Sequence, residues 1–144
     1  MRLRFESIVS LSAGEVWALE KDVSRLDQVS RPLLSLNLLP QAESTWREGG
    51  VYRFEIKIFC LIPWAVHEVR MVRYCDQTYT FETDESGGPI KVWKHTHQVL
   101  PLDPVRSICR DEIEIQAGVF SPLVWIIAQA LYRKRHRALR QANA

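Results

Sequence analysis

The feature that most constrains the fold is a long stretch of alternating side chains that ends in one apolar helix. From residue 51 to residue 117 apolar and polar residues alternate with few interruptions, as in the run from Val51 to Lys57. Such alternation is typical of half-buried strands, because successive strand side chains point to opposite faces. Clusters of glycine, proline and aspartate divide the stretch into consecutive antiparallel strands with one face to cover.

The flanking sequence completes the element order. Ser12 and Glu15 have the spacing of a capping box, which predicts the start of the first of two short helices, over 16–20 and 22–29. Ser121-Pro122 opens a long helix that runs to about Leu139 and is apolar over much of its circumference. We predict strands at 3–11, 33–39, 51–60, 65–75, 78–83, 92–100 and 105–117. The predicted fold class is therefore α+β, a curved antiparallel seven-stranded sheet wrapped around the C-terminal helix, with two short helices after strand 1.

Length and charge narrow the class of protein. A chain of 144 residues fits one compact domain over 1–144, and its net charge of +2 excludes a general polyanion binder. Basic side chains crowd the C-terminus at Arg133, Lys134, Arg135, His136, Arg137 and Arg140. They either are solvated and complement the helix dipole, or contact a membrane surface together with Trp125. Stacking aromatics hardly interleave with them, so we expect no nucleic-acid partner.

The cysteines and the apolar windows indicate the compartment. Cys60, Cys75 and Cys109 are an odd number without Cys-x-x-Cys spacing, and no basic-then-apolar leader opens the chain. We therefore expect a reduced, cytoplasmic protein. The most apolar window, 119–132, is interrupted by polar residues and proline and is shorter than the ~20 residues of a membrane-spanning helix.

One strand carries an unusual set of side chains on a single face. Trp93, His95 and His97 share a face by parity, and Asp111 falls on the helix-facing side of the last strand because the even-numbered positions there are mostly charged. A three-residue loop at 102–104 would place His97 opposite Cys109 and His95 opposite Asp111, close enough for a His–Asp hydrogen bond.

The preceding turn would likewise bring Phe81 beside Trp93 and Tyr79 beside His95. We therefore expect a pocket floor and candidate ligand-binding set of Tyr79, Phe81, Trp93, His95, His97 and Asp111.

Several interpretations of this floor stay open. His95 and Asp111 could simply satisfy each other, because buried polar groups must be paired. The same network could offer polar contacts to a ligand in an apolar cavity. His95, His97 and Asp111 could also hold a metal with one open position, although a lone His-x-His is a weak signal, and we expect no metal or cofactor. A His–Asp pair could act as a general base, but no activated nucleophile is evident.

A second group of polar residues lies on the strand before Asp76. His67, Glu68, Arg70 and Arg73 alternate poorly, with charges on both faces. Either they form a solvated edge or mouth region, or at least one of them enters the cavity.

These residues together resemble the START/polyketide-cyclase-like (SRPBCC, helix-grip) superfamily over essentially the whole chain, and bacterial members of unassigned function most of all. The resemblance rests on Ser12 to Trp17 followed by Asp22, Gly88-Pro89-Ile90, Trp93-x-His95-x-His97, Ser107 to Asp111, and Tyr132-Arg133. Ile90 stands where that pattern has an aromatic residue and Ser107 where it has threonine. The resemblance implies a cavity between sheet and C-terminal helix for lipids, polyketides, hormones or other hydrophobic molecules, and no single chemistry, because the superfamily includes enzymes, carriers and co-chaperones.

The sequence therefore favours a non-catalytic intracellular protein that binds a hydrophobic or amphipathic small molecule. The alternative is a cyclase, dehydratase or hydrolase that uses His95 and Asp111 as its catalytic pair.

Overall fold

Seven antiparallel strands and three helices make up the computed structural model, which describes residues 1–40 and 45–142. The elements are β1 (Arg2–Val9), α1 (Ala13–Glu20), α2 (Ser24–Ser30), β2 (Leu34–Leu38), β3 (Val51–Ile58), β4 (Ile62–Cys75), β5 (Thr80–Gly87), β6 (Ile90–Asp103), β7 (Arg106–Gln116), a short 3₁₀ turn (Gly118–Phe120) and α3 (Ser121–Gln141). The strand order is β1-β7-β6-β5-β4-β3-β2. This order confirms the predicted α+β helix-grip fold.

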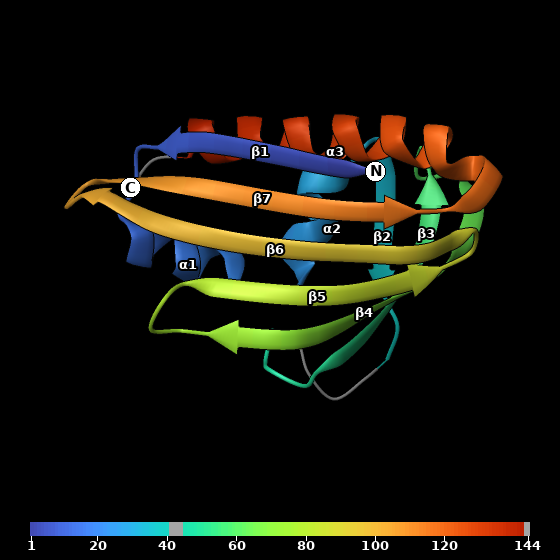
Figure 1. Ribbon diagram of the computed structural model, residues 1–144, viewed down its shortest axis with the longest axis horizontal. Coiled ribbons are helices and arrows are strands. Elements are labelled where there is room, and N and C mark those ends of the chain that lie inside the picture. Colours follow the sequence, from blue (N-terminus) through green and yellow to red (C-terminus); the bar gives the residue numbers. More distant parts are fainter. Residues whose placement is uncertain (41–44, 143–144) are drawn as a thin grey trace.

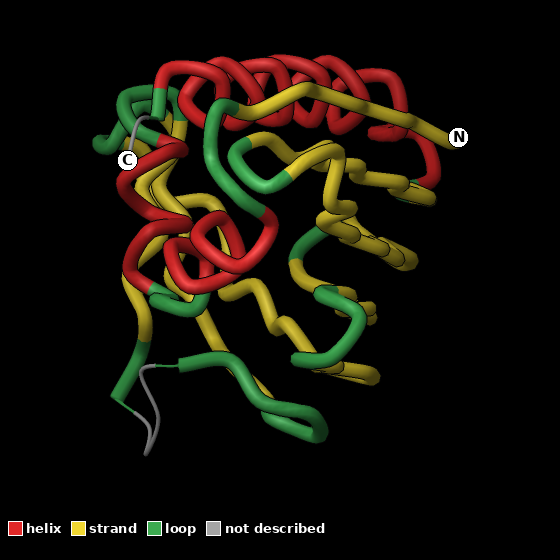
Figure 2. The backbone as a smooth tube through the Cα atoms, turned by 90° about the vertical axis from the view of Figure 1, so that its left-hand side faces the viewer, coloured by secondary structure: helices red, strands yellow, loops and turns green. Residues whose placement is uncertain are grey.

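The sheet bends around the helices. Strands β1, β7, β6, β5 and β4 lie side by side, whereas β2 and β3 turn away at one end, and α3 runs along the β1 edge (Figure 1). A view from the side shows the sheet curving away beneath α3, with α1 and α2 facing its concave side (Figure 2). The concave face therefore has helices on two sides.

Local signals explain where the helices begin and which face they bury. The Ser12 hydroxyl accepts a hydrogen bond from the Glu15 N–H at 3.3 Å and caps α1, and Pro122 occupies the first turn of α3. Helix α3 buries positions spaced by three or four residues: Val124, Ala128, Tyr132, His136 and Leu139. None of the helices within 1–40 and 45–142 is long and apolar enough to cross a membrane.

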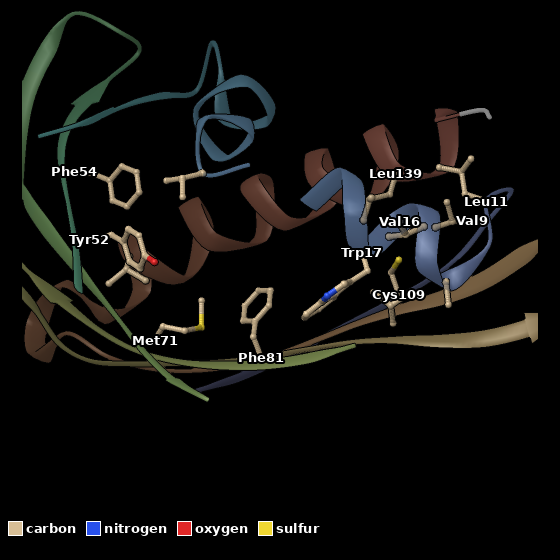
Figure 3. Packing of buried hydrophobic residues seen from close by; sticks show 14 residues of the cluster. Val9, Leu11, Val16, Trp17, Tyr52, Phe54, Met71, Phe81, Cys109 and Leu139 are labelled. Carbon is tan, nitrogen blue, oxygen red and sulfur yellow. The ribbon is translucent and has the colours of Figure 1, made fainter. Parts of the chain in front are cut away.

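The main apolar cluster joins the inner face of the sheet to α1 and the end of α3. Tyr52 and Phe54 on β3 and Met71 on β4 lie at one end of it, and Trp17 on α1 lies at the other, with Phe81 between them (Figure 3). All five side chains are buried. Burial of apolar area at about 25 cal/mol per Å² makes this cluster a main source of stability.

The predicted register between β6 and β7 is wrong by two residues. His97 lies opposite Asp111, not Cys109, and His95 lies opposite Ile113. An irregularity between Pro101 and Asp103 lengthens the ladder beyond the loop that the sequence predicts. Because the shift is even, the odd-numbered residues keep the inner face, as expected.

The register between β5 and β6 differs by four residues. Phe81 lies opposite His97 and Thr83 opposite His95, because β5 continues to Gly87 and a tight turn at residues 88–89 joins it to β6. Tyr79 does not lie beside His95. It lies before β5 in a left-handed conformation (φ 52°), and its ring packs 5.7 Å from that of Trp17.

Candidate functional site: a cavity beside a buried polar network

A cavity of about 170 Å³ lies between the inner face of the sheet and helices α2 and α3. One buried water needs roughly 10–15 Å³ by this measure, so the cavity has room for on the order of ten waters. Its apolar lining comprises Leu26, Val29, Leu34, Leu36, Trp46, Ile56, Ile58, Trp64, Val69, Met71, Phe81, Ile90, Trp93, Val124, Ile127, Leu131 and Leu139. Its polar lining comprises Glu20, Asp22, Arg25, Ser30, His67, Thr83, Glu85, His95, Tyr132 and Arg135.

Behind the cavity wall, Asp111 on β7 is the centre of a buried hydrogen-bond network. Its Oδ1 atom lies 2.5 Å from His95 Nε2 and 2.8 Å from His97 Nδ1, and its Oδ2 atom lies 2.7 Å from His136 Nε2. Burial alone would raise the pKa of Asp111, but the charges of His97 and Arg135 lower it well below its usual range. An ionised carboxylate only accepts hydrogen bonds, so each facing ring nitrogen carries a proton.

A second carboxylate, Glu20 at the end of α1, closes the network from the other side. Its Oε1 accepts a hydrogen bond from Arg135 Nη2 at 3.0 Å. Its Oε2 lies 2.6 Å from His97 Nε2, and these two atoms form an ion pair without the angles of a hydrogen bond. Burial opposes ionisation of Glu20, yet His97 and Arg135 lower its pKa to about 2. Burial likewise opposes the charge on His97, but Glu20 and Asp111 raise its pKa to about 9.

These four residues therefore form a neutral buried group, with Glu20 and Asp111 negative and His97 and Arg135 positive. Removing an ion from water costs several kcal/mol unless a partner of opposite charge compensates. Loss of any one of the four charges would therefore leave another buried and unpaired.

His136 links Asp111 to Ser7 on the inner face of β1. Its Nδ1 lies 2.7 Å from Ser7 Oγ, which also accepts a hydrogen bond from Arg140 Nη1 at 2.8 Å. When the His136 ring carries a single proton, on the Nε2 that donates to Asp111, its Nδ1 accepts a hydrogen bond from the Ser7 hydroxyl. A directed chain of donors thus runs from Arg140 to Asp111 and fixes α3 against β1.

His95, like Glu20 and Arg135, is a member of the network that reaches the cavity wall. Its Nε2 donates to Asp111, and its Nδ1 lies 3.3 Å from the Tyr132 hydroxyl on α3. When the ring carries a single proton, on the Nε2 that faces Asp111, the Tyr132 O–H donates to this nitrogen. Burial and the nearby Glu85 and Asp111 carboxylates raise the pKa of Tyr132 well above its usual range, so the phenol keeps its proton.

A separate polar group lies on the β4–β5 side of the cavity. Glu85 Oε2 lies 2.8 Å from His67 Nε2, and Glu85 Oε1 accepts from Thr83 Oγ1 at 2.6 Å. Burial opposes ionisation of Glu85, but the hydrogen bond and charge of His67 lower its pKa. Of the four polar residues expected at this strand, His67 therefore enters the cavity wall, whereas Glu68, Arg70 and Arg73 lie outside it.

The donor set around Asp111 does not fit a metal ion. His95, His97 and Asp111 do bring potential ligand atoms within 4.8 Å of one another. However, both facing imidazole nitrogens already donate to the carboxylate, and Arg135 Nε lies 3.9 Å from Asp111 Oδ2. A guanidinium and a protonated imidazole supply the positive charge that a cation would bring, so a metal would be repelled.

The structure brings most of the predicted floor together. Phe81, Trp93 and His95 line the cavity, and the predicted contact between His95 and Asp111 is present. His97 and Asp111 lie fully buried behind that wall, and Tyr79 lies outside the cavity, against α1.

Comparison with known proteins gives a family and a fold. Residues 7–143 match the model of the family described as Domain of unknown function (DUF8410). The chain belongs to this family. No curated protein matches this DUF8410 member.

Solved structures share the architecture of the DUF8410 chain. A Chromobacterium violaceum protein superposes with a TM-score of 0.74 at 14% identity, over 99% of both chains. A START superfamily protein from Mycobacterium smegmatis superposes with a TM-score of 0.68 at 15% identity, over 97% of both chains. The Zhui aromatase/cyclase from a Streptomyces species superposes with a TM-score of 0.71 at 11% identity, over 96% of this chain and 90% of the cyclase. The START/polyketide-cyclase-like resemblance is thereby confirmed for the fold.

Sequence reasoning missed half of the polar network. It placed Arg135 and His136 in a solvated basic tail, but both belong to the buried cluster around Asp111. The signal was present, because His136 continues the buried spacing of Ala128 and Tyr132 along α3. Glu20 gave no such signal, since its position at the end of a short helix is ordinarily solvated.

Proposed function

We propose that this protein binds a hydrophobic or amphipathic small molecule, lipid-like or polyketide-like, in the cavity between the sheet and α3. The observation that carries the proposal is the cavity itself, mostly apolar and interrupted by a few polar side chains. Ligand sites commonly combine an apolar wall with a small number of orienting polar groups. The free thiols of Cys60, Cys75 and Cys109 fit a reducing, cytoplasmic setting.

Native mass spectrometry of the protein purified from cells tests this function. We expect a mass increment that organic extraction releases as a small apolar molecule, together with rebinding from a lipid extract. A protein that carries no increment, and takes up nothing from lipid and aromatic ketone libraries, would contradict the proposal.

A second candidate is an enzyme that uses His95 as a general base. The observation in its favour is that Asp111 orients His95 while Nδ1 of the ring faces Tyr132 and the cavity. In this case His95→Gln should abolish turnover of a bound ketone or ester while its affinity changes less than about threefold. Unfolding of His95→Gln with Tyr132→Phe fully active would instead assign His95 a structural role.

We also propose transient contact of α3 with a membrane surface. Leu123 and Ile126 are 46% and 59% exposed near its start, and the helix contains cationic but no acidic residues. Sedimentation with phosphatidylglycerol vesicles tests this. Binding should fall in a Leu123→Glu, Ile126→Glu variant, and equal binding of that variant would contradict it.

A further inference from the structure

Glu85 is a largely buried carboxylate of the cavity wall with no guanidinium or ammonium group of the described residues paired with it, whereas Asp22 in the same wall is exposed. Across residues 1–40 and 45–142, Glu85 forms an ion pair only with His67, whereas Glu20 has the Arg135 guanidinium. The Glu85 side chain retains 12% of its exposure and lines the cavity. A carboxylate accepts about four hydrogen bonds, and Glu85 receives two, so it has acceptor capacity left for a ligand.

The surroundings of Glu85 are aromatic. Trp93 lies opposite it on β6, and the His67 and Trp93 rings meet edge to face at 6.2 Å. Trp64 also lines this cavity. Aromatic faces attract cations, and a low-dielectric wall strengthens the attraction of an ionised carboxylate for positive charge. Within the same wall Glu20 is balanced by Arg135 and His97, so Glu85 is the ionised carboxylate whose charge disfavours an anionic ligand beside it.

We propose that the ligand of this cavity is an amphipathic amine whose protonated nitrogen lies on Glu85 and whose apolar body lies among the aliphatic side chains of β3 and β4. The inference rests on the proposed function, since it names the chemical class of molecule for the same cavity. The free volume fits an apolar body of roughly ten to fifteen non-hydrogen atoms.

Three probes of nearly equal shape test the charge preference. We would measure the affinities of 2-naphthylmethylamine, 2-naphthylmethanol and 2-naphthoate by isothermal titration calorimetry at neutral pH. The amine should bind on the order of ten- to a hundredfold more tightly than the alcohol, as expected for a hydrogen bond to a charged group. The carboxylate should bind most weakly. A carboxylate that binds as tightly as the amine would overturn the proposal.

Matched variants assign the preference to one residue. Glu85→Gln keeps an oxygen acceptor for Thr83 and should remove most of the amine's advantage while leaving the affinity for the alcohol within about threefold. Asp84→Asn removes the neighbouring exposed carboxylate and should change nothing. An amine advantage that persists in folded Glu85→Gln overturns the assignment to Glu85. If that variant does not fold, the order of the three affinities in the wild-type protein decides whether the cavity prefers an amine.

The probes also separate this inference from the proposed function. If the alcohol binds and the amine is not preferred, only the amine assignment fails. If none of the three probes binds, the small-molecule function fails with it.

Discussion

Asp111 shows how one residue can organise a protein interior. Its two oxygens accept hydrogen bonds from three imidazoles on β6 and α3, so the orientation of His95, His97 and His136 depends on a single side chain. The carboxylate is fully buried, and its charge is balanced by groups that would be uncompensated without it. Its contribution to stability is therefore the cost of leaving its partners unpaired.

Asp111→Asn should destabilise the protein strongly. The amide cannot balance the positive charges of His97 and Arg135, and breaking a buried charge pair costs about 3–5 kcal/mol. Urea denaturation measures the change. Glu112→Gln is the matched control, because Glu112 points outward and its ion pair with Arg4, at 3.8 Å, is exposed. The control should shift the free energy of unfolding by less than about 0.5 kcal/mol, and equal losses in both variants would contradict the role of Asp111.

The charge on His97 predicts a pH dependence. The pKa is about 9 in the folded state and about 6.5 in an unfolded chain, so its stabilising effect is complete below about pH 6.5 and is lost as the pH rises through 9. Between about pH 6.5 and pH 8 the free energy of unfolding should fall by about 1.5 kcal/mol. The measurement ends at pH 8 because burial raises the pKa of the Cys109 thiol in the folded state. Above that pH the titration of cysteine in the unfolded chain would add its own change in stability.

His97→Gln should flatten this dependence, and urea midpoints across the same pH range measure it. A slope that survives the substitution would assign the titration to another group. On the acid side the sign reverses: Glu20 has its pKa lowered to about 2, so its contribution is present above its usual pKa of 4.5 and is lost as the pH falls through 2.

At the scale of elements, the alternation of side chains predicted the strands correctly, whereas irregularities in the strand pairing caused the errors in register. Alternation identified the strands and their inner faces, because the buried face of a strand must be apolar. The ladder irregularities near Pro101 and between Glu85 and Gly87 shifted two registers by two and four residues. Such irregularities have no fixed residue signature, so a loop length counted from sequence cannot locate them.

Gly87 is a position where the β4–β5 pairing admits no side chain. A Cβ at Gly87 would lie 2.5 Å from the Val66 carbonyl oxygen and 2.8 Å from the His67 Cα. Both are backbone atoms, so Gly87→Ala should cost about 3 kcal/mol, the upper part of the range for overpacking. Gly118→Ala meets nothing closer than 3.9 Å and should cost only about 1 kcal/mol for its left-handed conformation. Chemical denaturation compares them, and equal losses would exclude the steric explanation.

At the scale of the whole molecule, the cavity and the network share part of one wall, formed by Glu20, His95 and Arg135. The sequence predicted that His95 and Asp111 would meet, and they do despite the wrong register, because an even shift kept both on the inner face. The second carboxylate and its guanidinium could not be predicted, since Glu20 and Arg135 come from separate helices whose packing only the folded chain defines. Half of the site thus follows from strand parity and half from helix packing.

Because Asp111, His97 and His136 lie behind the cavity wall, the volume of the cavity can be changed from the β4 side without disturbing the centre of the network. Val69 on β4 is 4% exposed and lines the cavity, so Val69→Phe places a ring in empty space and should change the free energy of unfolding by less than about 1.5 kcal/mol. The affinity for 2-naphthylmethanol should fall by about tenfold or more, because the probe and the new ring compete for the same space. Val72→Phe adds the same ring at a position that is 54% exposed and should leave the affinity unchanged. Calorimetric titration of both variants decides whether the ligand occupies this cavity, and unchanged affinity in folded Val69→Phe would place binding elsewhere on the protein.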